Sequence, residues 1–195
     1  MKYFTFLSLI LLAIPSQGQE KKDAVLPAEI QIKTALLAAP DDKKEGAKVY
    51  GYDTHGNFVT LRNGTNDYIC IGDNPKNDGI SVACYPDKLE AFMARGRELS
   101  AAGEKGQERQ EIRDKEIESG KIKMPKEGML LVYYGKQEGY NPATGELADG
   151  KFRYVIYTPN ATTESTGLPD KPYAPGMPWL MDPGTPRAHI MITPK

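Results

Sequence analysis

Three methionines, the single tryptophan and one of the two histidines fall within a short stretch of the sequence: Met177, Trp179, Met181, His189 and Met191. Thioether sulfur and imidazole nitrogen are soft ligands, the kind that Cu(I) prefers in proteins. A tryptophan ring beside such an ion could shield it and make a cation–π contact. These residue types make the stretch a candidate copper site, and the sequence suggests no other cofactor.

The same residues also fit a simpler interpretation. Their spacing is not a recognised metal-binding signature. Methionine and tryptophan in a proline-rich segment commonly anchor that segment to the core by apolar burial. If residues 189–192 form a strand, His189 and Met191 share one of its faces, which suits either a metal site or packing. Packing is the favoured interpretation, so we expect no cofactor, and a copper site is the alternative.

Motifs for catalysis are missing from the sequence. It contains no Gly-x-Ser-x-Gly elbow, phosphate-binding glycine loop, dinucleotide glycine motif, His-Glu-x-x-His pair or EF-hand loop. His55 falls in a turn pattern, where we expect it to be exposed, and His189 falls in an apolar strand pattern, typical of a structural histidine. The 26 acidic residues give no means of choosing a glycosidase pair. The catalytic residues, if there are any, are unknown.

Tyrosines are numerous in the second half of the chain and have two interpretations. They could line a sugar or peptide cleft, or they could be ordinary sheet residues. The tyrosines concerned are Tyr133, Tyr134, Tyr140, Tyr154, Tyr157 and Tyr173. The leading hypothesis is therefore a non-catalytic binding or structural module. A soft-metal protein and a hydrolase acting on the cell envelope, with unidentified carboxylates, remain the alternatives.

The N-terminal residues have the pattern of a secretory signal. Lys2 precedes an apolar run that ends at Pro15, and small residues occupy positions 16 and 18. The run is shorter than the roughly 20 apolar residues that a spanning helix needs. We predict a signal peptide at 1–18, a flexible leader at 19–26 and one domain at 27–195. The protein is then exported to the periplasm or the medium, with no stable membrane insertion after cleavage.

The charge balance limits the partners. The sequence has 25 Lys and Arg against 26 Asp and Glu, a formal charge of −1, and removing Lys2 with the signal peptide makes it −2. A general nucleic-acid binder needs a basic face that displaces counterions from phosphates. We therefore expect no nucleic-acid partner. The ligand or protein partner stays unknown.

Cys70 and Cys84 are the only cysteines. Two thiols in an exported protein usually pair, because the destination is oxidising. A redox-active or metal-binding pair usually has the closer Cys-x-x-Cys spacing. We predict a structural disulfide, which at this loop length contributes on the order of 3 kcal/mol.

Short β-type runs separated by turn residues dominate the chain after Ala47. Asn63-Gly64 favours a type I′ hairpin turn between two of the runs. The expected strands are 48–52, 58–62, 68–71, 80–85, 129–134, 151–157 and, less regularly, 188–192. They predict an antiparallel β-meander of five to seven strands in which Cys70 and Cys84 lie on neighbouring strands.

Three helices and an irregular tail complete the expected elements. Pro27 opens a short helix that stops before Pro40. An amphipathic helix from Pro86 should cover the sheet, and a highly charged helix at 107–119 should have little to bury. Seven of the 15 prolines lie between 168 and 195, which excludes regular helix there. The predicted fold class is α+β, with a covering helix and a proline-rich C-terminal wrap.

Four segments resemble an uncharacterised family of exported bacterial proteins. They cover about the middle third of the chain. The segments are Gly51-Tyr52-Asp53, Leu61 to Asn66, Cys84-Tyr85-Pro86 and Phe92 to Leu99. The resemblance implies export and a shared fold, and it transfers no activity, cofactor or site residue.

Overall fold

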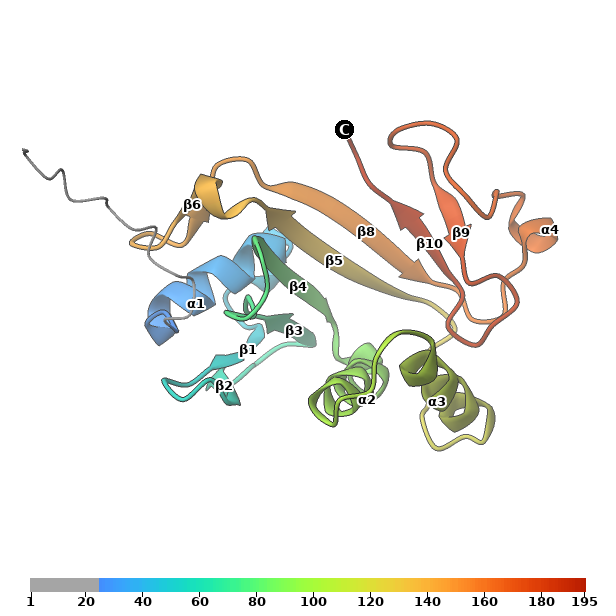
Figure 1. Ribbon diagram of the computed structural model, residues 1–195, viewed down its shortest axis with the longest axis horizontal. Coiled ribbons are helices and arrows are strands. Elements are labelled where there is room, and N and C mark those ends of the chain that lie inside the picture. The colour runs from blue at the N-terminus through green and yellow to red at the C-terminus, as the bar shows by residue number, and fades with distance from the viewer. Residues whose placement is uncertain (1–24) are drawn as a thin grey trace, which may run out of the picture.

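An eight-stranded sheet forms the centre of the molecule in the computed structural model, which describes residues 25–195 (Figure 1). The strand order is β2-β1-β3-β4-β5-β8-β10-β9, and a separate two-stranded ribbon pairs β6 with β7. The predicted signal peptide and most of the predicted leader lie outside the described residues. The α+β expectation is confirmed as helices with a mostly antiparallel sheet.

The elements have the following bounds. The strands are β1 Lys48–Tyr52, β2 Phe58–Arg62, β3 Tyr68–Ile71, β4 Ile80–Pro86, β5 Gly128–Gly135, β6 Tyr140–Asn141, β7 Glu146–Leu147, β8 Lys151–Tyr157, β9 Trp179–Met181 and β10 His189–Ile192. The α-helices are α1 Ala28–Ala35, α2 Glu90–Ala101, α3 Gly106–Glu118 and α4 Thr163–Thr166. Short 3₁₀ turns occupy Leu36–Ala38, Asp41–Lys43, Asp87–Leu89 and Gln137–Gly139.

Helices pack against both faces of the sheet, at different places (Figure 1). On one face, α1 and the turn after it pack over β1, β4 and β5, around Val49, Val82 and Leu131. On the other face, α2 buries Phe92 against a second cluster that includes Tyr85 and Tyr157. Alternate residues of each strand therefore fill two cores, one on each side of the sheet.

The meander is broken at β3. β1 and β2 form the expected antiparallel hairpin, but β3 pairs in parallel with the other side of β1 instead of with β2. The chain crosses the start of β1 at Gly64, where an added Cβ would lie only 2.8 Å from the backbone nitrogen of Lys48. Asn63-Gly64 is thus a close crossing and not the predicted hairpin turn. With β9 as an extra edge strand, the sheet has eight strands instead of five to seven.

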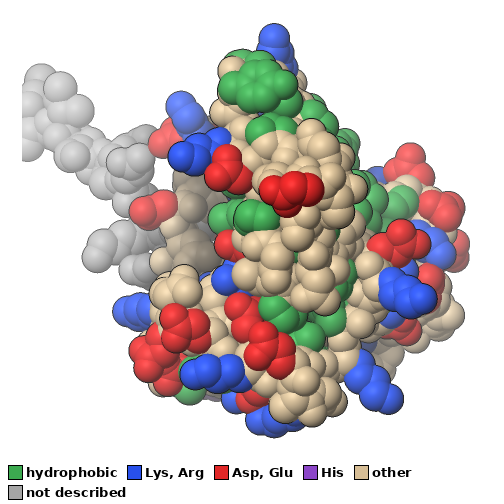
Figure 2. All heavy atoms as spheres, turned by 90° about the vertical axis from the view of Figure 1, so that its right-hand side faces the viewer, with side chains coloured by type: hydrophobic (Ala, Val, Ile, Leu, Met, Phe, Trp, Pro, Cys, Tyr) green, Lys and Arg blue, Asp and Glu red, His purple; other side chains and the backbone are tan. Residues whose placement is uncertain are grey.

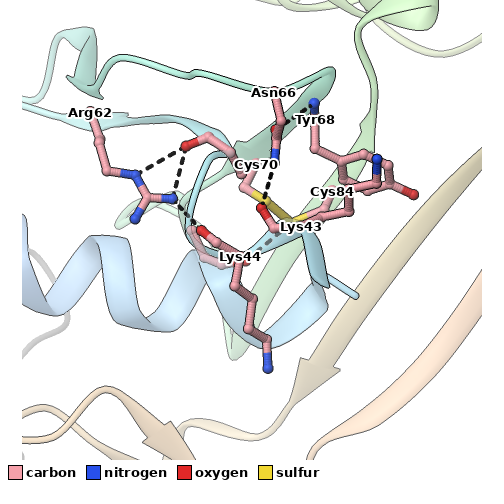
Figure 3. The surroundings of a disulfide bond; sticks show 9 residues. Lys43, Lys44, Arg62, Asn66, Tyr68, Cys70 and Cys84 are labelled. Carbon is pink, nitrogen blue, oxygen red and sulfur yellow. Dashed lines mark hydrogen bonds between the residues drawn. A yellow bond between two sulfur atoms is a disulfide. The ribbon is translucent and has the colours of Figure 1, made fainter. Parts of the chain in front are cut away.

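Cys70 and Cys84 occupy directly opposite positions of β3 and β4, and their sulfurs lie at bonding distance as predicted (Figure 3). Both are fully buried in the core beneath α1. Around them Arg62 and the Asn66 side-chain amide donate hydrogen bonds to backbone carbonyls of residues 43–47. Disulfide and hydrogen bonds together fix the crossing segment on the sheet.

Side-chain hydrogen bonds hold α1 in place. The Gln31 amide donates to the carbonyl of Tyr52 at 2.9 Å and accepts from the Tyr52 backbone N–H at 2.9 Å, so it acts as one more ladder partner at the end of β1. On the next turn Thr34 shares a buried hydrogen bond of 2.7 Å with the Tyr140 hydroxyl. Helix α1 is thereby linked to β1 through Gln31 and to the β6–β7 ribbon through Thr34. Both hydrogen bonds also supply the partners that buried polar groups require.

The charged helix α3 buries more than its sequence predicts. Arg113 lies 3.4 Å above the Phe92 ring and donates to the Phe92 carbonyl at 3.0 Å. Burial lowers the pKa of Arg113 to about 10. Glu116 is also buried and accepts from Arg95 of α2. Polar side chains, and not an apolar stripe, therefore join α3 to α2.

The last part of the chain builds the edge of the sheet beside β8. β10 pairs with β8 on one side and β9 on the other, both antiparallel. The proline-rich residues between β8 and β9 form loops and the short helix α4. Within residues 25–195 no helix is long and apolar enough to cross a membrane.

Candidate functional site

The outer strands β9 and β10 bring four of the five candidate ligands onto one face of the sheet. Met181 lies directly opposite His189, and Trp179 lies directly opposite Met191. Cross-strand partners point to the same side, and this side is the one that carries α2 and α3, because Met191 packs against that core cluster. The residue types are visible in the sequence, and the pairing of β9 with β10 aligns the side chains in two adjacent cross-strand rows.

His189 is held in one tautomer by the backbone carbonyl of Arg187. Its Nδ1 lies 2.8 Å from the carbonyl oxygen of Arg187, which can only accept, so Nδ1 carries the proton. Its ring lies 5.3 Å from that of Tyr157. Burial lowers the pKa of His189, so the ring is neutral at neutral pH. The lone pair is then on Nε2, which makes no hydrogen bond within the described part of the chain.

An ion-pair network fixes the turn that leads from β9 to β10. The Arg187 guanidinium pairs with Asp114 of α3 through Nε at 3.1 Å and with Asp182 through a second nitrogen. Asp182 has a φ of +56°, a left-handed conformation that aspartate tolerates better than most residues. The network ties β9, β10 and α3 together. It therefore sets the position of His189 relative to Met181.

A pocket of about 510 Å³ adjoins these strands, and we call it the C-terminal pocket. Its walls are mainly apolar, and they include Pro172, Tyr173, Pro175, Met177, Trp179 and Pro194. Tyr173 is 79 % exposed although it is a large aromatic side chain. Thr193 and Lys195 supply polar groups at the wall.

Figure 2 looks onto the β9 edge of the molecule. Hydrophobic side chains reach the surface there at several points between the top and the lower centre, and many of the charged side chains lie toward the sides and the bottom.

Met177 is separated from the other candidate ligands. It lies in the wall of the C-terminal pocket, two residues before the start of β9. Its backbone N–H donates a hydrogen bond to the Ala174 carbonyl at 3.2 Å, within a turn. Trp179 belongs to both features, since it lines the pocket and faces Met191. The sequence cluster thus divides into an aromatic pocket and a Met–His face that meet at Trp179.

The remaining candidates do not converge on a common site. His55 lies exposed in the β1–β2 turn, as expected, while β10 with His189 lies near the opposite edge of the sheet. Tyr140 and Tyr157 are buried. Tyr133 and Tyr154 pack on the α1 side. These tyrosines therefore line no common cleft with Tyr173.

The sequence did not predict several residues that lie on this part of the sheet. Arg187 and Asp114 are 73 residues apart, so only the fold reveals their ion pair. The Asp182-Pro183-Gly184 turn pattern is visible in the sequence and could have suggested that β9 and β10 form a hairpin. Arg153 was also missed: its guanidinium lies 4.8 Å from the Tyr134 ring on the same sheet face, with no carboxylate partner among residues 25–195.

Within the described residues, each carboxyl group whose pKa departs from its ordinary value has a lowered pKa. These groups are Asp41, Asp53, Asp67, Glu116 and Glu164. For Glu116 the main cause is the pair of hydrogen bonds from Arg95. Lowered pKa values keep these groups ionised, whereas a general acid requires a raised one.

No protein-family model, no curated protein and no solved structure matches this chain.

Proposed function

We propose that this protein is an exported binding module and that the C-terminal pocket binds its ligand. The observation that carries the proposal is the pocket itself, an open hollow of about 510 Å³ with Trp179, Tyr173 and prolines in its walls. Ligand sites are typically concave and apolar, with a few polar groups that orient the ligand. Lys195 is the basic side chain at this wall, which favours a flat apolar or aromatic ligand that carries an acidic group.

The proline-rich segment suits such a site. Each proline fixes φ and removes a backbone donor, so the loop loses little further entropy when a ligand binds. Leu180 is fully buried and its N–H donates to the Pro169 carbonyl at 2.8 Å, which fastens the outer loop to β9. The pocket wall is therefore built on an anchored loop, and the wrap around the domain is part of this proposal.

Export belongs to the same proposal. It is supported by the signal-like residues 1–18 and by the buried Cys70–Cys84 pair, since structural disulfides persist in oxidising compartments. Membership of the exported bacterial family named above is proposed on the quoted segments alone. A binding role is favoured over an envelope hydrolase because the wall of the C-terminal pocket, within the described residues, contains no Asp or Glu side chain.

The test uses the aromatic anion 1-anilinonaphthalene-8-sulfonate as a probe. Trp179 is the only tryptophan, so energy transfer from it to the dye reports binding near the pocket. We expect one saturable site, with Kd raised at least fivefold in Tyr173→Ala. Phe58→Ala is the matched control, because Phe58 is also an exposed aromatic but lies on β2 at the other edge of the sheet. Absence of saturable binding, or equal loss in both variants, would refute the proposal.

A further inference from the structure

The helix-side face of β9 and β10 carries a second feature beside the pocket. Met181 and His189 form one cross-strand row, and Trp179 and Met191 form the next. Met181 is 38 % exposed, and His189 and Met191 are partly exposed, so solvent reaches the face. Two thioethers and one imidazole thus lie together on a surface that an ion can approach.

The spacing of the backbone suits coordination of one ion. Directly opposite residues have Cβ atoms about 5 Å apart, which applies to Met181 and His189. His189 and Met191 are two residues apart on one strand, or about 7 Å. Each methionine has three flexible side-chain bonds, so both sulfurs can turn toward a point beside the imidazole.

The imidazole is already oriented as in a metal ligand. Histidines that bind metals usually donate their second ring N–H to a carbonyl or carboxylate, which fixes the tautomer and directs the other nitrogen to the ion. In His189 the Nδ1–H donates to the Arg187 carbonyl, and Nε2 is left as the ligand atom. Arg187 is fixed in turn by its ion pairs with Asp114 and Asp182.

We propose that Met181, His189 and Met191 bind one soft monovalent cation, Cu(I) or Ag(I), with the Trp179 ring beside the ion. Thioether and imidazole ligands select soft metals, whereas Mg²⁺ and Ca²⁺ require oxygen ligands. Residues 25–195 contain no group of three or more His, Cys, Asp or Glu side chains that could hold a harder ion. The site shares Trp179 with the C-terminal pocket, and it excludes Met177, which lies in the pocket wall.

Ag(I) is the probe, added as the nitrate to oxidised protein in chloride-free buffer. Ag(I) is stable in the monovalent state without a reductant, so no thiol reductant is present that could open the disulfide or bind the metal itself. Isothermal titration gives affinity and stoichiometry, and methionine methyl resonances in NMR identify the ligands. We expect one equivalent to bind and to shift the methyl resonances of Met181 and Met191.

The variants preserve packing while they remove ligand atoms. Met181→Leu and Met191→Leu replace sulfur with carbon, and His189→Asn keeps a donor near the Nδ1 position but lacks Nε2. Each should weaken Ag(I) binding at least tenfold. The matched controls Met177→Leu and Met129→Leu, in the pocket wall and on the α1 side, should bind as the native protein does.

Circular dichroism first confirms that each variant is folded. Absence of one-equivalent binding by the native protein would overturn the inference and assign these methionines to packing. So would equal weakening in the controls, because it would indicate scattered binding to thioethers. Either result leaves the dye test of the pocket unaffected, since Tyr173 takes no part in the metal site.

Discussion

Removal of the Cys70–Cys84 bond should lower the free energy of unfolding by about 3–4 kcal/mol. The perturbation is the double variant Cys70→Ala/Cys84→Ala, together with native protein that has been reduced while unfolded and then refolded in reductant. The reduced protein keeps both sulfurs and lacks only the crosslink. The double variant lacks the crosslink and the two buried sulfurs.

The expected magnitude follows from the loop and from the burial. The bond closes a loop with a sequence separation of 14, for which loss of unfolded-chain entropy contributes about 3 kcal/mol. Both cysteines are fully buried beside Ala35, whose carbonyl lies 3.3 Å from the Cys84 sulfur. Truncation of the two side chains leaves a small cavity, worth about another 1 kcal/mol. We therefore expect losses of about 3 kcal/mol on reduction and about 4 kcal/mol in the variant.

The assay is urea unfolding followed by circular dichroism, with the free energy of unfolding extrapolated to zero denaturant. The slope of that free energy against urea should also rise without the crosslink, because the unfolded chain exposes more surface. A difference below about 1 kcal/mol between oxidised and reduced protein would refute the reasoning. It would mean that the unfolded chain keeps β3 and β4 together without the bond.

Two further predictions concern the ion pairs. Arg187→Ala leaves the partly buried Asp114 and Asp182 carboxylates unpaired and should lower the free energy of unfolding by about 3–5 kcal/mol. Arg187→Lys should restore little of this loss, because the second ion pair needs the forked guanidinium group. Thermal unfolding measures the loss, and an alanine variant as stable as the native protein would contradict the prediction. Hydrogen bonds from Arg95 and a neighbouring lysine lower the pKa of Glu116 to about 2. The folded state thus favours the ionised form, so the stabilisation is present above the unfolded pKa near 4.5 and is lost as the pH falls toward 2. Glu116→Gln should lower the free energy of unfolding by about 1–2 kcal/mol at pH 7, a value that already allows for solvent screening of the exposed lysine, and by almost nothing at pH 2. Urea unfolding across this pH range measures the loss. A loss of stability that grows on acidification would contradict the prediction.

Local patterns in the sequence were sufficient for most of the elements. The β5 and β8 runs, the start of α1 after Pro27 and the amphipathic stripe of α2 all follow from periodicity and from proline geometry. The cysteine pair followed from composition and compartment. These features depend on residues within about ten positions of one another, or on residue counts, and no knowledge of the fold is needed to read them.

Long-range pairing was not encoded in any local pattern. Asn63-Gly64 is compatible with a hairpin turn, yet β3 lies on the other side of β1, where Ile69 and Cys70 each reach a core on their own face of the sheet. Burial on both faces contributes more than one favourable turn dipeptide, so tertiary packing decides the strand order.

The candidate site divides in the same way. The soft and aromatic side chains and their clustering between residues 177 and 191 can be read directly from the order of the amino acids. The folded chain is needed to show that Met181 lies opposite His189, that Trp179 lies opposite Met191 and that Met177 lies in the pocket wall. That alignment depends on the β9–β10 register, which is fixed by pairing with β8 and by the tie from Arg187 to α3. Such contacts join residues far apart in the chain, and their energy exists only once both partners are folded.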